Sequence, residues 1–158
     1  MNDSSFMELM KQHEGIVFKL VNLYATDLED RKDLVQEIMY QAWKGYSKFE
    51  GRSSFSTWLY RICLNTIFTQ KRKKHPVDYT ESLDQISPKV ENLVTGSLEA
   101  KALHAAVRSL PEADRAIISL HLDGYDHADI ADIIGLTDGN VRVKLHRIKK
   151  QLTNMLKD

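Results

Sequence analysis

Apolar residues in the first part of this chain recur at spacings of three and four, the period of helices that pack on one face. The pattern predicts a helix over residues 6–24 and a second over about 31–44. Asp27 or Asp30 is expected to cap the start of the second helix, and Gly45 is expected to end it. A polar loop follows, and a third helix begins at Phe55.

The same period returns after residue 97. It predicts a short helix over 98–107, a helix that starts after Pro111 and closes at Gly124, a short isoleucine-rich helix near 130–134, and a last helix from Asp138. The last helix places five apolar side chains in one narrow stripe: Val141, Leu145, Ile148, Leu152 and Leu156. The chain is therefore expected to be helical at both ends.

Between these two sets, from Pro76 to about Thr95, the helical pattern is lost. This segment contains two prolines, two serines and an excess of acidic residues, which is typical of an irregular linker. The sequence therefore predicts an all-α chain with two small helical domains, residues 1–76 and 97–158, joined by a flexible acidic linker at 77–96.

The formal net charge of zero hides an uneven distribution. Residues 61–75 carry five cations and no acid, and residues 139–157 carry six cations and no acid. Residues 76–100 carry one lysine against five acids. Local patches, and not the total, set the field that a polyanion meets, so both basic segments are candidate nucleic-acid surfaces. The neutral total argues against indiscriminate coating of DNA.

The segment 49–74 predicts a helix with two different surfaces. One side of the helix is apolar: Phe55, Trp58, Leu59, Ile62, Cys63 and Thr66. A second stripe carries Arg61, Asn65, Phe68 and Arg72. Cations interleaved with an aromatic ring and an amide suit single-stranded nucleic acid, in which bases are unstacked and accessible. The alternative is a core helix with a solvated basic end, and Phe55 and Trp58 are expected to pack inside the fold.

Residues 130–152 combine a short apolar helix, a glycine-containing turn and a longer helix with a basic outer face. That is the helix-turn-helix arrangement, in which the second helix enters the major groove. Arg142 and His146 are placed to reach base edges, and Arg147, Lys149 and Lys150 to reach phosphates. The alternative is a helical hairpin with a solvated cationic face, and agreement between turn, stripe and charge favours DNA binding.

Several function classes find no support. Cys63 is the only cysteine, so a disulfide framework or a thiolate zinc site is not expected. The six histidines are scattered without metal-ligand spacing, and no glycine-rich phosphate loop or nucleophile motif is present. We therefore expect no enzyme, no metal and no cofactor. With no signal peptide and no apolar run of about 20 residues, we expect a cytoplasmic protein without membrane insertion.

Three stretches together resemble the extracytoplasmic-function (ECF) sigma factors, the smallest two-domain type in the sigma-70 family of RNA polymerase subunits. The stretch Asp33-Leu34-Val35-Gln36-Glu37, followed by Ala42-Trp43, resembles region 2.2. Residues 49–72 resemble regions 2.3 and 2.4, and residues 139–150 resemble region 4.2. The match covers nearly the whole chain in the expected order.

The resemblance implies a protein that binds core RNA polymerase through the β′ clamp helices and the β flap, directs it to promoters and assists strand opening. It also implies an anti-sigma factor as a partner. The implied polymerase-binding residues are Asp33, Leu34, Gln36 and Glu37. The implied −10 DNA-binding residues are Phe49, Ser54, Ser56, Arg61, Asn65, Lys71 and Arg72, with a pocket for a flipped base formed by residues 49–56 together with Asn65. The implied −35 DNA-binding residues are Asn140, Arg142, Val143, His146, Arg147 and Lys150.

Three positions depart from the family pattern. Glu50 stands where a basic residue is often found beside the base pocket, and Val143 where a small polar residue is common. The segment Asp126-His127-Ala128-Asp129 replaces the usual Ser/Thr-x-x-Glu before the helix-turn-helix. The alternative function is a helix-turn-helix regulator with an N-terminal sensing or dimerisation module. That alternative leaves the 33–37 stretch and the basic 61–74 segment without a role.

Overall fold

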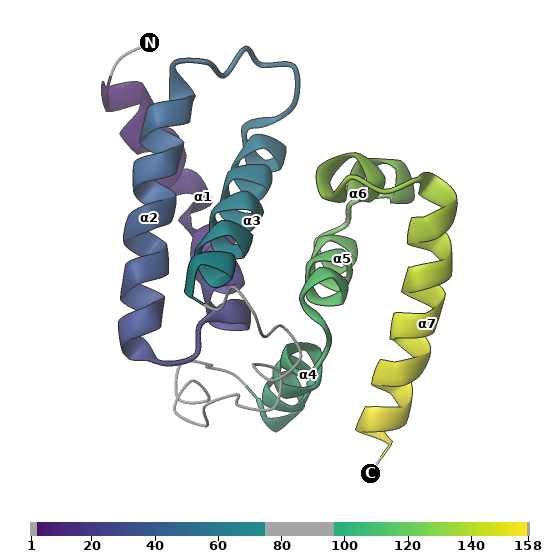
Figure 1. Cartoon of the computed structure of the whole chain (residues 1–158). Coiled ribbons are helices and arrows are strands. Elements are labelled where there is room, and N and C mark those ends of the chain that lie inside the picture. The colour runs from purple at the N-terminus through teal and green to yellow at the C-terminus, as the bar shows by residue number, and fades with distance from the viewer. Residues whose placement is uncertain (1–2, 75–96, 158) are drawn as a thin grey trace. The chain divides into compact units, whose positions relative to one another are not determined.

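The computed structural model of the chain describes residues 3–74 and 97–157, which contain seven helices and no strand (Figure 1). The chain divides into two compact units, Met1–Val90 and Glu91–Asp158. The expected all-α fold with two helical bodies is confirmed. The linker predicted at 77–96 lies outside the described residues. Over the described part of the chain, no helix has both the length and the apolar content that crossing a membrane requires.

The first unit consists of three helices that pack pairwise against one another (Figure 1). They are α1 (Asp3–Tyr24), α2 (Leu28–Tyr46) and α3 (Phe55–Lys74). Their shared core is apolar, and its members include Phe6, Val17, Leu20, Leu34, Ile38, Leu59, Tyr60, Cys63 and Ile67. Asp27 caps α2, since its carboxylate accepts a hydrogen bond from the backbone N–H of Asp30 at 2.8 Å.

Gly45 does not cap α2 as expected. The helix continues through Gly45 to Tyr46. Its C-cap is Ser47, whose backbone has the right-handed helical conformation that any residue can adopt. Gly45 instead lies where α3 approaches α2: a Cβ placed there would be 3.4 Å from Cζ2 of Trp58 and 3.6 Å from Cδ1 of Ile62. A methyl group would just touch both side chains, so a larger side chain has no room in that direction.

The buried side of α3 is wider than predicted. Tyr60, Leu64 and Ile67 lie in the core although they were not assigned to it, whereas Trp58 and Ile62 are only half-buried. The reason is that α3 packs against both α1 and α2, so side chains on two neighbouring faces leave solvent. A single apolar stripe describes a helix with one packing face, which α3 does not have.

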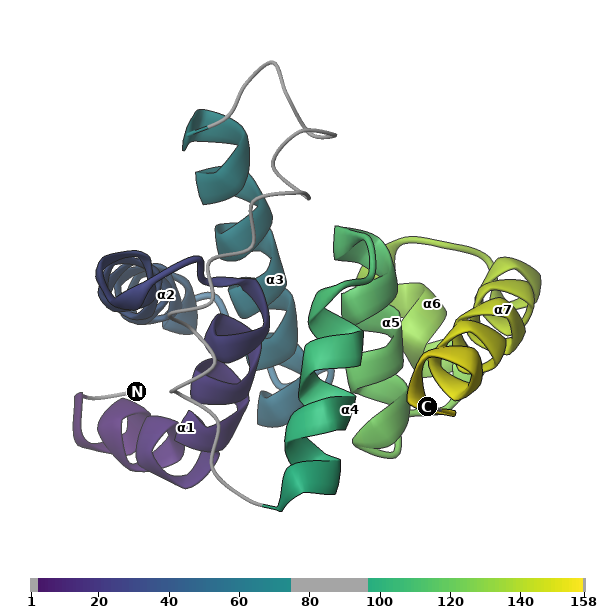
Figure 2. The same ribbon diagram turned by 90° about the horizontal axis from the view of Figure 1, so that it is seen from below.

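In residues 97–157, the second unit consists of four helices (Figure 2). They are α4 (Leu98–Arg108), α5 (Glu112–Leu122), α6 (His127–Ile134) and α7 (Asp138–Leu156). Helix α7 packs against the other three. Its predicted stripe is buried at Val141, Leu145, Ile148 and Leu152. Leu156 was wrongly included, because it is the last residue of the helix and remains 43% exposed.

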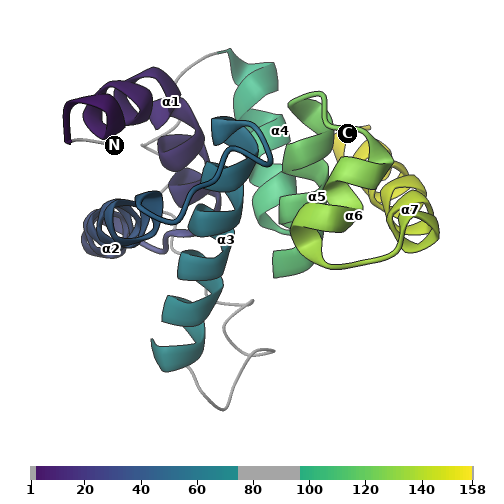
Figure 3. The ribbon, with the colours of Figure 1, turned by 90° about the horizontal axis from the view of Figure 1, so that it is seen from above.

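A tight turn joins α6 to α7 (Figure 3). Gly135 ends α6 with φ of 88°, a left-handed conformation that glycine adopts at little cost. Thr137 then caps α7, its hydroxyl accepting a hydrogen bond from the backbone N–H of Asn140 at 3.1 Å. The turn predicted from the sequence is therefore present, with a left-handed glycine on one side and a side-chain cap on the other.

Candidate nucleic-acid interface

The outer face of α7 is an exposed basic surface of the second unit. Every residue predicted to contact the −35 element is exposed on it: Asn140, Arg142, Val143, His146, Arg147 and Lys150. The opposite side of the helix is the buried stripe, so α7 is held against its unit by one face and presents the other to solvent. This is the arrangement that a helix needs to enter a major groove.

The start of α7 carries an ion pair on this outer face. Nε of Arg142 lies 3.7 Å from Oδ1 of Asp138, one turn earlier in the helix. Both side chains are at least half exposed, so the pair contributes little to stability. Its consequence is positional, because it orients the guanidinium before any DNA phosphate or base competes for it.

The helix that precedes the turn is capped by an acid. Oδ1 of Asp126 accepts a hydrogen bond from the backbone N–H of Asp129 at 2.8 Å. Asp126 therefore performs the capping that the family's Ser/Thr at this position would provide. The departure from the family pattern leaves the start of α6 satisfied, and adds negative charge at the positive end of the helix dipole.

His121 of the second unit departs from the ordinary behaviour of a histidine. The pKa of His121 is lowered, first by partial burial and then by the positive charges of Lys149 and His127. His121 is thus mainly uncharged at neutral pH. The basic character of this unit comes from its lysines and arginines, and His121 adds little to it.

In the first unit, an aromatic cluster fixes the loop between α2 and α3. The ring of Phe49 stacks on Tyr46 at 6.3 Å and meets Phe55 and Trp58 at 5.9 and 5.3 Å. Phe55 is 8% exposed, and Trp58 is half-buried beside it. Phe55 packs inside the fold as expected, whereas Trp58 packs in the aromatic cluster and stays half-buried. Phe49, which was predicted to line the base pocket, anchors the loop through the same cluster.

Hydroxyl groups gather at the start of α3. Oγ of Ser54 lies 3.1 Å from Oγ of Ser56, donates to Oγ1 of Thr57 at 3.0 Å, and accepts from the backbone N–H of Thr57 at 3.2 Å. Ser54 is exposed and Ser56 is half-buried. At the neighbouring loop, Glu50 and Arg52 form an exposed ion pair at 3.0 Å. The loop thus offers hydroxyl donors and acceptors beside one acid and one cation.

Asn65 lies apart from this loop. It lines a polar groove between α2 and α3, with Glu37, Gln41, Ile62, Thr66, Thr69, Gln70 and Lys73. Within the groove, Nε2 of Gln41 donates to Oε2 of Glu37 at 2.8 Å. No residue of the 49–56 loop lines it. The groove at Asn65 therefore receives no side chain from the 49–56 loop, and the base pocket expected from residues 49–56 together with Asn65 stays a prediction.

The predicted phosphate contacts differ in their surroundings. Arg72 is exposed, and its Nε donates to the backbone oxygen of Phe68 at 3.4 Å. Arg61 is half-buried. Phe68 is half-buried too, with its ring edge-on to Tyr24 at 5.7 Å, so it does not form part of an open stripe with Arg61 and Arg72 as predicted.

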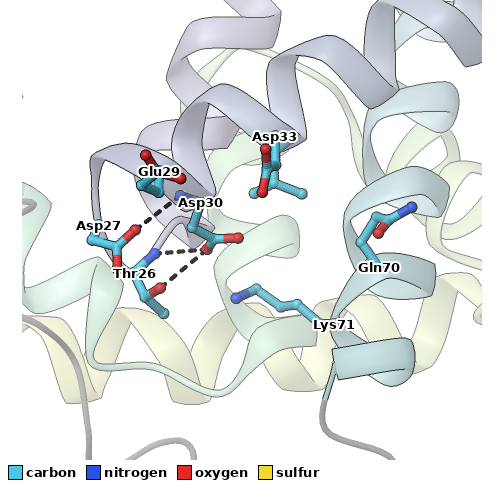
Figure 4. A pocket seen from close by; sticks show the side chains of 8 residues that line it. Thr26, Asp27, Glu29, Asp30, Asp33, Gln70 and Lys71 are labelled. Carbon is cyan, nitrogen blue, oxygen red and sulfur yellow. Dashed lines mark hydrogen bonds between the residues drawn. The ribbon is translucent and has the colours of Figure 1, made fainter.

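Lys71 extends toward the acidic start of α2 (Figure 4). The pocket it lines also contains Thr26, Asp27, Glu29, Asp30, Asp33, Leu34 and Gln70. Asp30 is engaged by Thr26, accepting from its backbone N–H at 2.9 Å and from its hydroxyl at 3.2 Å. Carboxylates next to Lys71 reduce the attraction that a DNA phosphate would feel there. Of these two neighbouring cations, Arg72 is exposed, whereas Lys71 is half-buried beside carboxylates.

The predicted polymerase-binding residues are not equally accessible. Asp33 and Gln36 are exposed and Glu37 is half-buried, but Leu34 is 2% exposed and belongs to the core. Leu34 therefore packs inside the unit and cannot make a surface contact. Successive residues of a helix point about 100° apart, so Leu34 points into the core although its neighbour Asp33 is exposed.

An apolar groove between α1 and α2 was not predicted. Phe18 and Leu28, 39% and 55% exposed, lie there with Arg31, Lys32, Val35 and Gln36. The guanidinium of Arg31 lies 5.9 Å from the centre of the Phe18 ring. Leu28 is the residue from which this groove could have been predicted. It was missed because the second helix was predicted to start at about residue 31, whereas α2 begins at Leu28.

Half-buried Lys19 and the buried thiol of Cys63 influence each other's ionisation in the first unit. Nζ of Lys19 donates to the hydroxyl of Tyr60 at 2.7 Å. Partial burial lowers the pKa of Lys19 to about 8, and the nearby thiol of Cys63 opposes this shift. Burial raises the pKa of Cys63 to about 12, which Lys19 opposes in turn. The thiol is thus fully protonated and inert in the folded unit. Among the described residues, no three His, Cys, Asp or Glu side chains gather to hold a metal ion.

A three-helix unit with polar and aromatic groups on one helix, and a four-helix unit with an exposed basic recognition helix, define a two-module DNA-binding protein. Comparison with known families makes this specific. Residues 9–76 match Sigma-70 region 2, and residues 100–152 match Sigma-70, region 4. The chain is 32% identical over 168 residues to the ECF RNA polymerase sigma-E factor of Escherichia coli (strain K12), covering 97% of this chain and 87% of that protein.

Other relatives agree. The ECF RNA polymerase sigma factor SigM of Mycobacterium tuberculosis (strain ATCC 25618 / H37Rv) is 28% identical over 155 residues, which cover 96% of this chain and 77% of SigM. The fold is similar to that of the sigma factor RpoE from Bartonella quintana, solved with the anti-sigma factor NepR, at a TM-score of 0.75 and 21% identity over 97% of both chains. It is also similar to CnrH, at a TM-score of 0.69 and 20% identity, over 98% of this chain and 89% of CnrH.

The chain therefore belongs to the ECF sigma factors of the sigma-70 family. It is an RNA polymerase sigma factor that directs the polymerase to promoters. Sigma factors are not enzymes in the catalytic sense. The alternative interpretation, a regulator with a sensing or dimerisation module, is not favoured, because it gives no account of the match to Sigma-70 region 2.

Proposed function

We propose that the two units contact opposite ends of a promoter, with residues 1–76 at the −10 element and residues 97–158 at the −35 element, joined by the linker 77–96. The observation that carries this proposal is the exposed basic face of α7 opposite its buried stripe. Arg142 and His146 read base edges in the major groove, while Arg147 and Lys150 hold phosphates. Asn140 supports the contact at the start of the helix.

At the −10 element, two surfaces on the first unit take different nucleotides of one strand. Ser54 and Ser56 engage a flipped base beside the loop anchored by Phe49, and Asn65 engages a second base in the groove between α2 and α3. Ser54 and Asn65 are eleven residues apart, so they are separated by about 16 Å along the helix. That is several times the roughly 3.4 Å between stacked bases, which supports separate contacts. Arg61 and Arg72 hold phosphates.

Strand opening needs no bond to be made or broken by this chain. A surface that binds unpaired bases, and not paired ones, shifts the opening equilibrium toward the open state by its binding free energy. We therefore infer that the chain has no catalytic residue and needs no cofactor in this role. Its site of action is the cytoplasm, where RNA polymerase works.

Polymerase docking falls to the outer side of α2. Asp33, Gln36 and Glu37 contact the β′ clamp helices, where carboxylates and an amide suit a partner that carries arginines. Leu34 supports these residues from the core without touching the partner. The second unit contacts the β flap. A partner that covers these surfaces would silence the chain, and the anti-sigma factor in the RpoE structure supports such a partner here.

In vitro transcription with purified core polymerase tests the proposal. Adding the chain should produce transcripts that depend on specific promoters, and the chain should copurify with the β′ subunit. An Asp33→Arg/Gln36→Arg double variant should lose both properties while keeping its helical content. If the wild-type chain binds DNA but never retains β′ and yields no promoter-dependent transcript, the regulator alternative holds instead.

A further inference from the structure

Val143 is an apolar side chain at the centre of the basic face of α7. It is 57% exposed. It follows the buried Val141 by two residues, so it points about 200° around the helix from that side chain, almost directly away from the core. Neighbouring side chains therefore do not cover its methyl groups.

Folding of the unit offers no reason for a valine at this position. A β-branched side chain loses χ1 freedom in a helix, and an exposed one recovers no burial in return. A lysine or arginine, as at the flanking positions 142 and 144, forms helix more readily. What distinguishes Val143 from an ordinary exposed apolar residue is its surroundings: Arg142, His146, Arg147 and Lys150 lie on the same face.

The chemistry of the major groove restricts what such a side chain can contact. Valine neither donates nor accepts a hydrogen bond, so pressing it against a polar base edge leaves that edge without its water partners. Among the groups that the four base pairs present in the major groove, only the C5-methyl of thymine is apolar. Cations on the same face can bind phosphates, which positions the helix so that Val143 lies next to base edges.

We propose that Val143 contacts the C5-methyl group of a thymine in the −35 element, and so selects T·A at one position of the promoter. This inference rests on the proposed placement of α7 in the −35 major groove. Val143 is the sixth residue of the helix, and residues near the start of the second helix are those that reach base edges in helix-turn-helix proteins. Arg142 and His146 then read the bases on either side of this thymine.

The experiment uses holoenzyme reconstituted from core polymerase and the full chain. A template pool randomised over the −35 element is selected with the wild-type chain, with Val143→Ser, and with Leu156→Ser. The last is the matched control, an exposed apolar residue at the far end of the same helix. Each thymine of the selected element is then replaced by deoxyuridine, which lacks only the methyl group, and binding is measured.

Wild-type holoenzyme and the Leu156→Ser control should enrich thymine at one position, and uridine there should weaken binding about fourfold, the effect of one buried methyl group. Val143→Ser should lose both the enrichment and the sensitivity to uridine, while keeping the contacts at other positions. A selected −35 element with no methyl sensitivity, or sensitivity that persists in Val143→Ser, overturns this inference alone. Failure to select any −35 element contradicts the proposed function, and the inference falls with it.

Discussion

Helices α3 and α7 both carry cationic side chains, but they are buried in different ways. Helix α7 buries one narrow stripe and exposes a continuous face along its first four turns. Helix α3 packs against both other helices of its unit, and its accessible groups are divided among the loop at its start, the Asn65 groove and Arg72. A continuous face suits a duplex groove, whereas separated patches suit a strand whose bases are apart.

The largest expected effect breaks the packing of α3. Leu59 is completely buried, so Leu59→Ala should destabilise the first unit by about 2–5 kcal/mol. Cys63 is the chain's only cysteine and is buried in the same unit, so its rate of reaction with a thiol reagent reports opening of that unit. The exposed control Asn65→Ala should leave the rate unchanged. Equal rates for Leu59→Ala and wild type would contradict the assigned core.

The next effect concerns the face of α7. Arg142→Ala should weaken binding of the holoenzyme to its −35 element by about 1–3 kcal/mol and relax the preference at one base pair. Lys150→Ala should weaken binding to all sequences alike and reduce the salt dependence by about one unit of slope. Lys157→Ala, beyond the end of the helix, is the control. The distinction between base and phosphate contacts fails if the two variants behave identically at every salt concentration.

Both helices begin with a hydroxyl cap, which allows the same substitution in each unit. Ser54→Ala and Thr137→Ala should each destabilise their own unit by about 1 kcal/mol, and the glycine variants by only a few tenths. Hydrogen exchange resolved by residue would measure the loss separately in residues 3–74 and 97–157. A loss that spreads from one unit to the other would show that the two bodies are not independent.

The smallest effect is a pH dependence confined to the first unit. The pKa of Lys19 is lowered to about 8 in the fold, so between pH 8 and its unfolded value of 10.5 the unfolded chain binds more protons, and stability rises with pH. The pKa of Cys63 is raised from 9.0 to about 12, so above pH 9 the unfolded thiol ionises first; this contribution offsets the rise from Lys19 up to pH 10.5 and lowers stability above it. The rise between pH 8 and 9 stays below about 1.4 kcal/mol, the ceiling for one proton per pH unit.

Denaturant unfolding at pH 8 and 9 measures the rise, and unfolding at about pH 11 measures the fall. Lys19→Met should remove the rise, and Cys63→Ala should remove the fall at higher pH while leaving the rise in place. The second unit contains neither residue and should show neither change. A rise of equal size in Lys19→Met would assign it to another group.

The sequence predicted the exposed and buried residues of α7 better than those of α3, because α7 has one narrow buried stripe and α3 packs on two sides. Each exposed residue on the face of α7 was predicted correctly, because the apolar residues of a helix with one buried stripe also determine which residues lie on the opposite side. On α3, the burial of Tyr60 and Ile67 was missed, since packing on two sides removes the simple alternation of faces. Leu34 was included with its neighbours by resemblance to a motif, although its own register turns it inward.

Features that depend on a partner distant in sequence were also out of reach. Phe68 was grouped with Arg61 and Arg72, but the ring of Tyr24 on α1 draws it into an aromatic contact. The separation of Asn65 from the 49–56 loop follows from helix length, and could have been computed from the sequence by counting residues. The apolar groove at Phe18 needed the actual start of α2, which helix propensity places only to within a few residues.

Gly45 has a consequence for how such a chain can diverge. Because Gly45 lacks a side chain, the indole of Trp58 lies so near the α2 backbone that a Cβ there would be only 3.4 Å from it. This close approach sets the distance between the exposed residues of α2 and those of α3. Exposed residues of either helix can be exchanged one at a time without changing this distance. A bulky residue at position 45 would instead push α3 away from α2 and change the distances between all of these residues together. Gly45 therefore fixes the spacing between the two helices while their exposed side chains remain free to vary.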